Sequence, residues 1–261
     1  MPLEEDKPVK TPATVSTENL TTEPYASILC YPKPTETEVQ NRIEELKTLG
    51  VSAIEFTGRG NAFNVPVLGK GFVGVVVAAH LKGVRAALKM RRVDADRPSL
   101  HHEATMLTKT NAVQVGPLLI RVSKNFLLMQ LINGDPLPAW LKTHTEKEKV
   151  RKVLTDILEQ CWRLDGVGVD HGELSKAPKH LIVDEMGKPW IIDFETASDT
   201  RKPANITAVC QYLFMGGGAV AGAVAEALGE RNRSGIIEAL RSYKKERTRE
   251  NFDHVKQVCL G

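Results

Sequence analysis

Apolar positions follow one spacing in the first half of the chain and another in the second half. Short β-branched runs near glycines predict strands at residues 52–57, 65–68, 73–79 and 84–90. The strands at 65–68 and 73–79 are expected to pair across a glycine-rich turn. Before them, apolar residues at helical spacing predict a helix that begins at Thr35. The first half is therefore expected to be rich in β-structure.

The pattern changes near Asn133, after which helical spacing dominates. Residues 146–164 and 234–247 have the composition of long helices, whereas the strands shrink to residues 181–183 and 190–193. A β-rich half followed by a helix-rich half predicts an α+β fold, since a parallel α/β fold would alternate the two kinds of element.

These patterns divide the chain into three segments. Residues 1–24 are rich in Thr, Glu and Pro without apolar periodicity, so they are expected to form a mobile tail. Residues 25–133 are expected to form an N-terminal extension and a β-rich lobe, and residues 134–261 a helical lobe. A chain of 261 residues is long enough for two such lobes.

Composition narrows the class of protein. Hydrophobic residues make up 42% and charged residues 26%, which excludes a disordered or fibrous chain. No run approaches the roughly 20 apolar residues that a bilayer requires, and the start lacks the order of a signal peptide, so a cytoplasmic protein without membrane contact is expected. The cysteines are far apart in sequence, which predicts isolated reduced thiols: Cys30, Cys161, Cys210 and Cys259.

A glycine-rich motif, L-G-K-G-F-V-G-V-V-V, begins at Leu68. Gly69, Gly71 and Gly74 have the spacing G-x-G-x-x-G, which dinucleotide-binding folds and kinases share. Valines follow Gly74 and favour a strand over the helix that a dinucleotide-binding fold requires. The glycines are therefore expected in a β-hairpin whose backbone covers phosphates, with an ordinary glycine-rich hairpin as the alternative.

Two charged residues stand in apolar surroundings. Lys89 lies in the predicted strand A-A-L-K-M, and Glu103 lies on the predicted helix that follows. Because burying a lysine without a partner is costly, Lys89 is expected to meet a counter-charge, for which Glu103 is the candidate. The alternatives are a solvated lysine on an edge strand and a glutamate on a solvated helix face.

A polar loop, H-G-E-L-S-K-A-P-K-H, runs from His171 to His180 and enters a short strand, and W-I-I-D-F-E follows from Trp190. A hairpin of the two strands is expected to bring this loop and Asp193 to the same end. An acidic residue at the end of an apolar strand favours a divalent cation, which takes oxygen ligands. An aspartate that caps a turn is the alternative.

Together these motifs resemble the protein-kinase-like superfamily. The resemblance is strongest to its RIO-like branch, which includes the kinase subunit of the archaeal tRNA-modifying complex. It spans about residues 67–212 and depends on the order and spacing of five elements. The resemblance implies a bilobal protein-kinase-like fold that binds ATP together with Mg²⁺ or Mn²⁺.

The resemblance also implies roles for individual residues. Glu173 falls at the position of the catalytic acid and Asp193 at that of the metal-binding aspartate, and Lys89 would contact the phosphates. The last four residues of the implied nucleotide-binding set belong to the strand-to-hinge segment beside adenine. That set is Gly69, Gly71, Gly74, Val76, Lys89, Glu103, Met129, Gln130, Leu131 and Ile132.

The chain departs from the family's pattern at three positions. Glu173 replaces an aspartate, which moves the carboxylate by one methylene. His180 replaces the usual metal-binding asparagine after a lengthened loop, and an imidazole ligand favours manganese over magnesium. Glu195 replaces the glycine of D-F-G and is either a second metal ligand or a solvent-facing acid.

The short stretch between Asp193 and the apolar helix at residues 206–214 leaves no room for a long activation segment. The prediction is an atypical RIO-like serine/threonine protein kinase, with autophosphorylation or ATPase activity included. A small-molecule kinase of the aminoglycoside or lipopolysaccharide-kinase type and a non-catalytic nucleotide-binding regulator are the alternatives. A basic run from Arg241 to Arg249 predicts either a solvated helix face or contact with RNA or a ribonucleoprotein.

Overall fold

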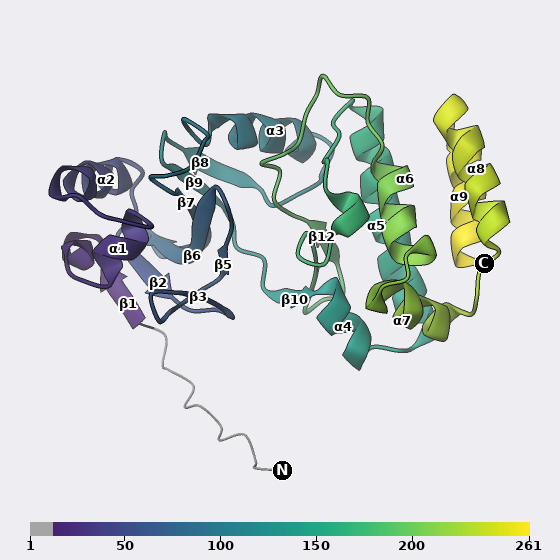
Figure 1. Ribbon diagram of the computed structural model, residues 1–261, viewed down its shortest axis with the longest axis horizontal. Coiled ribbons are helices and arrows are strands. Elements are labelled where there is room, and N and C mark those ends of the chain that lie inside the picture. Colours follow the sequence, from purple (N-terminus) through teal and green to yellow (C-terminus); the bar gives the residue numbers. More distant parts are fainter. Residues whose placement is uncertain (1–12) are drawn as a thin grey trace, which may run out of the picture. The chain divides into compact units, whose positions relative to one another are not determined.

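The computed structural model describes residues 13–261 and divides into two compact units (Figure 1). Unit 1 comprises residues 13–101 together with Ile120–Leu131. Unit 2 comprises His102–Leu119 and Ile132–Gly261. Strands predominate in unit 1 and helices in unit 2, which confirms the α+β fold expected from the change in apolar spacing.

Unit 1 is built on an antiparallel sheet with the strand order β1-β2-β6-β7-β9-β8, to which β5 adds through β6. A separate two-stranded sheet pairs β3 with β4. The strands are β1 (Ala13–Ser16), β2 (Ala53–Phe56), β3 (Gly60–Ala62), β4 (Val65–Val67), β5 (Gly69–Lys70), β6 (Gly74–Leu81), β7 (Val84–Arg91), β8 (Leu119–Val122) and β9 (Phe126–Gln130).

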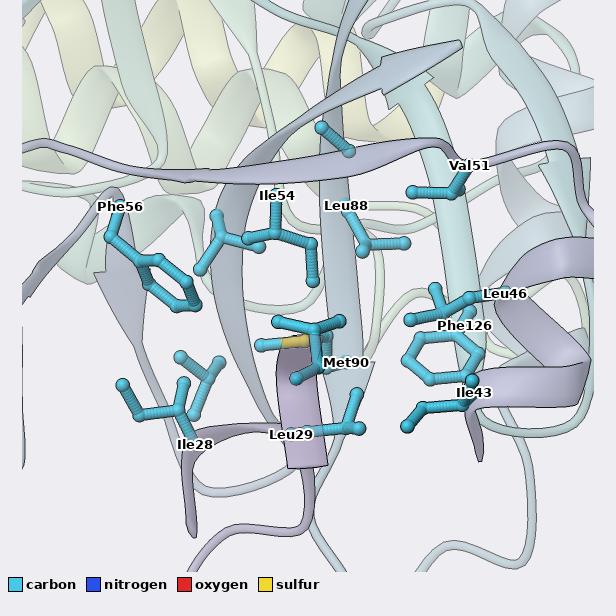
Figure 2. Packing of buried hydrophobic residues seen from close by; sticks show 14 of the residues in the cluster. Ile28, Leu29, Ile43, Leu46, Val51, Ile54, Phe56, Leu88, Met90 and Phe126 are labelled. Carbon is cyan, nitrogen blue, oxygen red and sulfur yellow. The ribbon is translucent and has the colours of Figure 1, made fainter. Parts of the chain in front are cut away.

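Short helices pack on one face of this sheet. They are the 3₁₀ helix η1 (Thr17–Thr21), α1 (Tyr25–Leu29) and α2 (Glu36–Thr48). The predicted start of α2 is confirmed, because the hydroxyl of Thr35 accepts a hydrogen bond from the backbone N–H of Glu38 at 3.3 Å. Side chains from α1, α2, β2, β7 and β9 form the core (Figure 2): Ile28, Leu29, Ile43, Leu46, Ile54, Phe56, Leu88, Met90 and Phe126.

The prediction of a mobile tail is wrong for residues 13–24. Ala13–Ser16 is an edge strand paired with β2, and Leu20 in η1 is fully buried. The backbone N–H of Thr17 also donates to the carbonyl of Ser52 at 3.0 Å. Four residues of strand are too few for a detectable apolar period, so only the sheet identifies this segment. The rest of the predicted tail, residues 1–12, lies outside the described residues.

The expected pairing of residues 65–68 with 73–79 is also corrected. Val65–Val67 pairs with Gly60–Ala62, and the partner of β6 across the glycine-rich turn is the two-residue strand β5. A turn just before Val65, with positive φ angles at Phe63 and Asn64, directs β4 back to β3.

Unit 2 consists mainly of helices. They are α3 (His101–Asn111, whose first residue belongs to unit 1), α4 (Leu137–Thr143), α5 (Lys147–Gly166), η2 (Leu174–Lys176), α6 (Asn205–Cys210), the π-helical η3 (Gln211–Met215), α7 (Ala219–Leu228), α8 (Arg233–Lys245) and α9 (Arg249–Leu260). Its only named sheet within the described residues has the order β10-β11-β12, formed by Gly134–Pro136, Leu181–Asp184 and Pro189–Ile191. The predicted hairpin after the His171–His180 loop is confirmed by the β11–β12 pair.

The four cysteines are free and buried. Their expected isolation does not hold for one pair, since the Sγ atoms of Cys210 and Cys259 lie 4.0 Å apart. Over residues 13–261, no single helix has both the length and the apolar character to cross a membrane. Length and composition suffice only for Asn205–Met215 and Ala219–Leu228 taken together, and this pair is bent by 75°.

Candidate functional site

The glycine-rich motif of unit 1 forms a hairpin, as predicted. Gly69 lies in β5 and Gly74 begins β6, and the backbone N–H of Gly71 donates to the carbonyl of Gly74 at 2.8 Å. Phe72, between the two bonded glycines, is 92% exposed. The residues after Gly74 form a strand, so the dinucleotide-binding alternative, which needs a helix there, does not apply.

The three glycines differ in what the fold demands of them. A Cβ atom on Gly74 would lie 2.8 Å from the carbonyl oxygen of Met90 and 3.1 Å from Cγ of Lys89. At Gly69 nothing lies within 4 Å of such an atom, and at Gly71 the nearest atom is at 3.9 Å. Gly74 is thus needed for the lysine stem to pass, whereas packing within the chain does not require the other two.

Lys89 occupies a central strand rather than an edge. It lies in β7 opposite Val76 of β6 and Leu127 of β9. Its neighbours Leu88 and Met90 point into the core (Figure 2), so strand alternation directs Lys89 to the opposite face of the sheet. Lys89 is only 4% exposed, which removes the alternative of a solvated edge lysine.

The predicted hinge segment follows directly from the sheet. Met129 and Gln130 end β9, opposite Ala87 and Ala86 of β7. Leu131 is the last residue of this part of unit 1, and Ile132 is the first of the following part of unit 2. The segment thus connects the units, and its contact with adenine remains a prediction.

In unit 2, the loop that carries Glu173 is fastened to the chain after Asp193. Asp170 accepts hydrogen bonds from Nε of Arg201 at 2.6 Å and from the backbone of Ala204 at 2.9 Å. Asp170 and Ser198 also exchange two backbone hydrogen bonds, at 2.8 and 2.9 Å. Gly172 has φ +91°, a conformation that favours glycine, and a Cβ atom there would lie 3.2 Å from the carbonyl oxygen of Thr196 and 2.5 Å from the Arg201 guanidinium.

A buried network continues this attachment into the helical core. The side chain of Asn205 accepts from the backbone N–H of His171 at 2.9 Å and donates to Asp165 at 2.8 Å. The hydroxyl of Tyr243 donates to the other oxygen of Asp165 at 2.9 Å. Burial raises the pKa of Asp165, against the lowering effect of these hydrogen bonds. Side chains from three helices therefore supply the buried hydrogen bonds that hold this loop in place.

His171 holds the backbone just before Asp193. Its Nε2 lies 3.0 Å from the carbonyl oxygen of Ile192, and because a carbonyl only accepts, Nε2 carries the proton. Burial lowers the pKa of His171 to about 4, so the ring is neutral near pH 7. Asp193 itself adopts φ +68°, a left-handed conformation that residues other than glycine seldom take and that clusters at functional sites.

Metal-ligating atoms of Glu173, His180 and Asp193 lie within 4.8 Å of one another. Nδ1 of His180 is 3.4 Å from Oε2 of Glu173. A second group of the same size joins Asp193 to Glu103 and Glu195. Carboxylate oxygens fit Mg²⁺ or Mn²⁺, and the single imidazole fits Mn²⁺ better, so these residues have the chemistry to hold a divalent cation.

The placement of Glu103 beside Asp193 and Glu195 was missed by sequence reasoning, which related Glu103 only to Lys89. Helix α3 packs on the chain that follows Asp193: Nε2 of His102 lies 2.8 Å from the carbonyl of Ala197. Lys109 forms an ion pair with Asp199 in the same stretch. Glu103 is 3% exposed, so the alternative of a solvated helix face does not hold. No local sequence pattern predicts that Glu103 lies beside Asp193 and Glu195.

The protein belongs to the kinase-like fold class. The features that define it are the antiparallel sheet of unit 1, the helices of unit 2 and the β11–β12 hairpin that leads to Asp193. A family model described as the RIO domain matches residues 81–209. An uncharacterized protein of Methanocaldococcus jannaschii is 32% identical over 100 residues, which is 38% of this chain and 83% of that protein. The chain therefore belongs to the RIO domain family, as its motifs led us to expect.

The matched region contains Lys89, Glu103, Glu173, His180 and Asp193. It begins after the glycine hairpin and leaves the first 80 residues outside. Membership in the family makes the protein kinase-like and supports nucleotide binding.

Proposed function

We propose that the protein is an ATP-dependent phosphotransferase that acts on serine or threonine hydroxyls of a protein, including its own. The observation that carries this proposal is the convergence of Glu173, His180 and Asp193, whose ligating atoms lie within 4.8 Å of one another. Phosphoryl transfer needs positioned groups and neutralised charge more than covalent chemistry, and this cluster offers both.

Each unit would supply its own part of the reaction. In unit 1, Lys89 would orient the phosphates beneath the backbone of the glycine hairpin, and residues 129–132 would hydrogen-bond adenine. In unit 2, Asp193 and His180 would hold a divalent cation, which supplies charge neutralisation for the transferred group. Glu173 would accept the hydrogen bond of the acceptor hydroxyl and take its proton.

One observation favours a small-molecule acceptor as the second candidate. Residues 194–204 are all that separates Asp193 from α6, and the bonds of Asp170 to Arg201, Ser198 and Ala204 hold this stretch in place. A segment this short offers little docking surface for a peptide. Assays with protein hydroxyls and with a panel of small alcohols and amino sugars distinguish the two acceptors.

Within the basic run, the residues on α8 are the better candidates for the predicted RNA contact. Arg247 donates to the carbonyl of Pro203, and Arg249 is bonded to Glu159, so both belong to intramolecular packing. The exposed cations of the basic run on α8 are Arg241, Lys244 and Lys245. An RNA partner, if it binds here, would meet these three.

Replacing Lys89 with methionine is expected to weaken ATP binding about 10- to 100-fold, the usual loss for one hydrogen bond to a charged group. Methionine keeps the stem that passes Gly74, so the fold should persist. The measurement is the ATP dissociation constant together with transfer from labelled ATP. Lys82→Met, at an exposed position in the same unit, is the matched control. Unchanged ATP affinity in Lys89→Met would remove Lys89 from the site.

The metal preference is expected to depend on His180. With an imidazole ligand, transfer should be at least as fast with Mn²⁺ as with Mg²⁺, since nitrogen ligands favour the softer ion. His180→Asn replaces that nitrogen with an amide oxygen and should shift the preference towards Mg²⁺. Transfer rates at saturating ATP across both metals measure the shift, and an identical metal profile in the variant would exclude His180 as a ligand.

A further inference from the structure

The link between α1 and α2 meets the glycine hairpin within unit 1. The carbonyl of Tyr31 in this link accepts a hydrogen bond from the backbone of Val93, just beyond β7, at 2.9 Å. The Tyr31 ring lies 4.8 Å from the Arg92 guanidinium carbon and 5.3 Å from Nζ of Lys70. The Phe63 ring, at the turn of the β3–β4 hairpin, is 5.2 Å away. One ring thus contacts three separate segments.

Arg92 connects the Tyr31 ring to the tip of the glycine hairpin. Its NH1 group donates to the carbonyl of Gly71 at 3.2 Å, and its backbone N–H donates to the carbonyl of Val73 at 2.8 Å. Asp94 receives the remaining guanidinium hydrogen bonds, at 2.6 and 2.8 Å. The carbonyls on both sides of Phe72 are therefore held by a single arginine.

The hairpin has little structure of its own to fix its position. Strand β5 has two residues, and their partners in β6 are Val76 and Val75. Neither Gly69 nor Gly71 has a side chain that could pack, and Phe72 projects outward, 92% exposed. Contacts from outside the hairpin therefore add to its few internal hydrogen bonds in fixing where its tip lies.

We propose that Tyr31 is a positioning residue that, through Arg92 and Lys70, fixes the glycine hairpin in its phosphate-binding geometry and so sets the affinity for ATP. The inference depends on the proposed ATP binding. It assigns a role to Tyr31 and Lys70, which precede the matched RIO domain. Stacking on the Tyr31 ring adds to the two hydrogen bonds from Arg92 to Asp94 in holding the guanidinium beside Gly71, so loss of the ring weakens that hold.

The test compares Tyr31→Leu with Tyr31→Phe, which keeps the ring and should behave as the parent protein. In Tyr31→Leu, the amides of Gly71 and Arg92 should exchange hydrogen faster and trypsin should cleave sooner after Lys70. The ATP KM should rise about 3- to 10-fold with kcat nearly unchanged, as for lost uniform binding. Tyr25→Leu is the matched control, because it removes an equal ring from the same extension, one that stacks on Phe56 of β2 at 4.8 Å.

Arg92→Met tests the same link without altering the extension, and it should reproduce both effects if Tyr31→Leu fails to fold. Equal hydrogen-exchange rates of the Gly71 and Arg92 amides in Tyr31→Leu and Tyr31→Phe would show that the Tyr31 ring does not hold the hairpin, whether or not the protein binds ATP. A looser hairpin with unchanged ATP affinity would overturn the positioning role. If the parent protein does not bind ATP, the proposed function fails. The hydrogen-exchange data then show separately whether Tyr31 holds the hairpin.

Discussion

Glu173→Gln is expected to slow phosphoryl transfer by about 10²- to 10⁴-fold, the usual cost of a lost acid–base group. Glutamine matches glutamate in size, so the loop, which is bonded through Asp170, should keep its shape. It cannot take the acceptor's proton. ATP affinity should stay close to that of the parent, because Glu173 acts on the acceptor. Single-turnover transfer and ATP binding, measured in parallel, check both parts.

Two controls separate the possible roles of Glu173. Glu185→Gln, at the exposed β11–β12 turn, removes the same charge from the same unit and should leave transfer unchanged. Excess Mn²⁺ should restore transfer in Glu173→Gln only if the carboxylate acts chiefly as a metal ligand. Glu173→Asp shows whether the longer side chain is adapted to the longer loop, in which case the shorter carboxylate also impairs transfer.

Equal transfer in Glu173→Gln and the parent would contradict the catalytic assignment. A nucleotide-binding regulator would then describe the protein better, because no hydroxyl would need positioning. An RIO domain with intact ATP binding but no dependence on Glu173 or Asp193 would support the same alternative.

Arg42→Met is expected to lower the free energy of unfolding of unit 1 by about 1–3 kcal/mol, the cost of leaving a buried acceptor without its donor. The Arg42 side chain is fully buried and its Nε donates to Glu38 at 2.7 Å. Its NH1 group donates to the carbonyls of Leu29 at 2.8 Å and Arg91 at 2.6 Å. The variant leaves these acceptors without their donor, although methionine fills part of the space.

Urea unfolding followed by a probe in unit 1 measures this loss. The matched control is Arg85→Met, since Arg85 is likewise bonded to a carboxylate, that of Glu55, but its side chain is 40% exposed. Because water reaches the Arg85 guanidinium, the control should lose about 0–1 kcal/mol, the range for ion pairs at the protein surface. A loss from Arg42→Met no larger than that of the control would show that Arg42 does not hold α2 against the sheet.

Local signals predicted the elements that carry the site. Thr35 was identified as the start of α2 because a capping residue and helical spacing occur together within a few positions. The valines after Gly74 indicated a hairpin, since β-branched residues favour extended backbone. The turn between two short apolar runs predicted the β11–β12 hairpin, which brought Asp193 to the end of the His171–His180 loop.

The errors fall where a residue's environment comes from distant parts of the chain. Residues 13–16 become a strand only because β2 offers an edge 40 residues later in the sequence. The approach of Cys210 to Cys259, which were expected to be isolated, likewise depends on helices that meet in space. Such contacts leave no period or motif in the local sequence.

The sequence by itself determined the α+β class, the RIO-type motifs and the identity of Lys89, Glu173 and Asp193 as the chemical candidates, because spacing and residue type are local properties. Only the tertiary structure decided that Glu103 joins Asp193 and Glu195, and that Arg201 fastens the loop of Glu173 through Asp170. It alone also placed the Tyr31 ring against Arg92 beside the glycine hairpin. The reason is physical: hydrogen bonds and ion pairs act over a few ångströms, and packing of the whole unit decides which groups come that close.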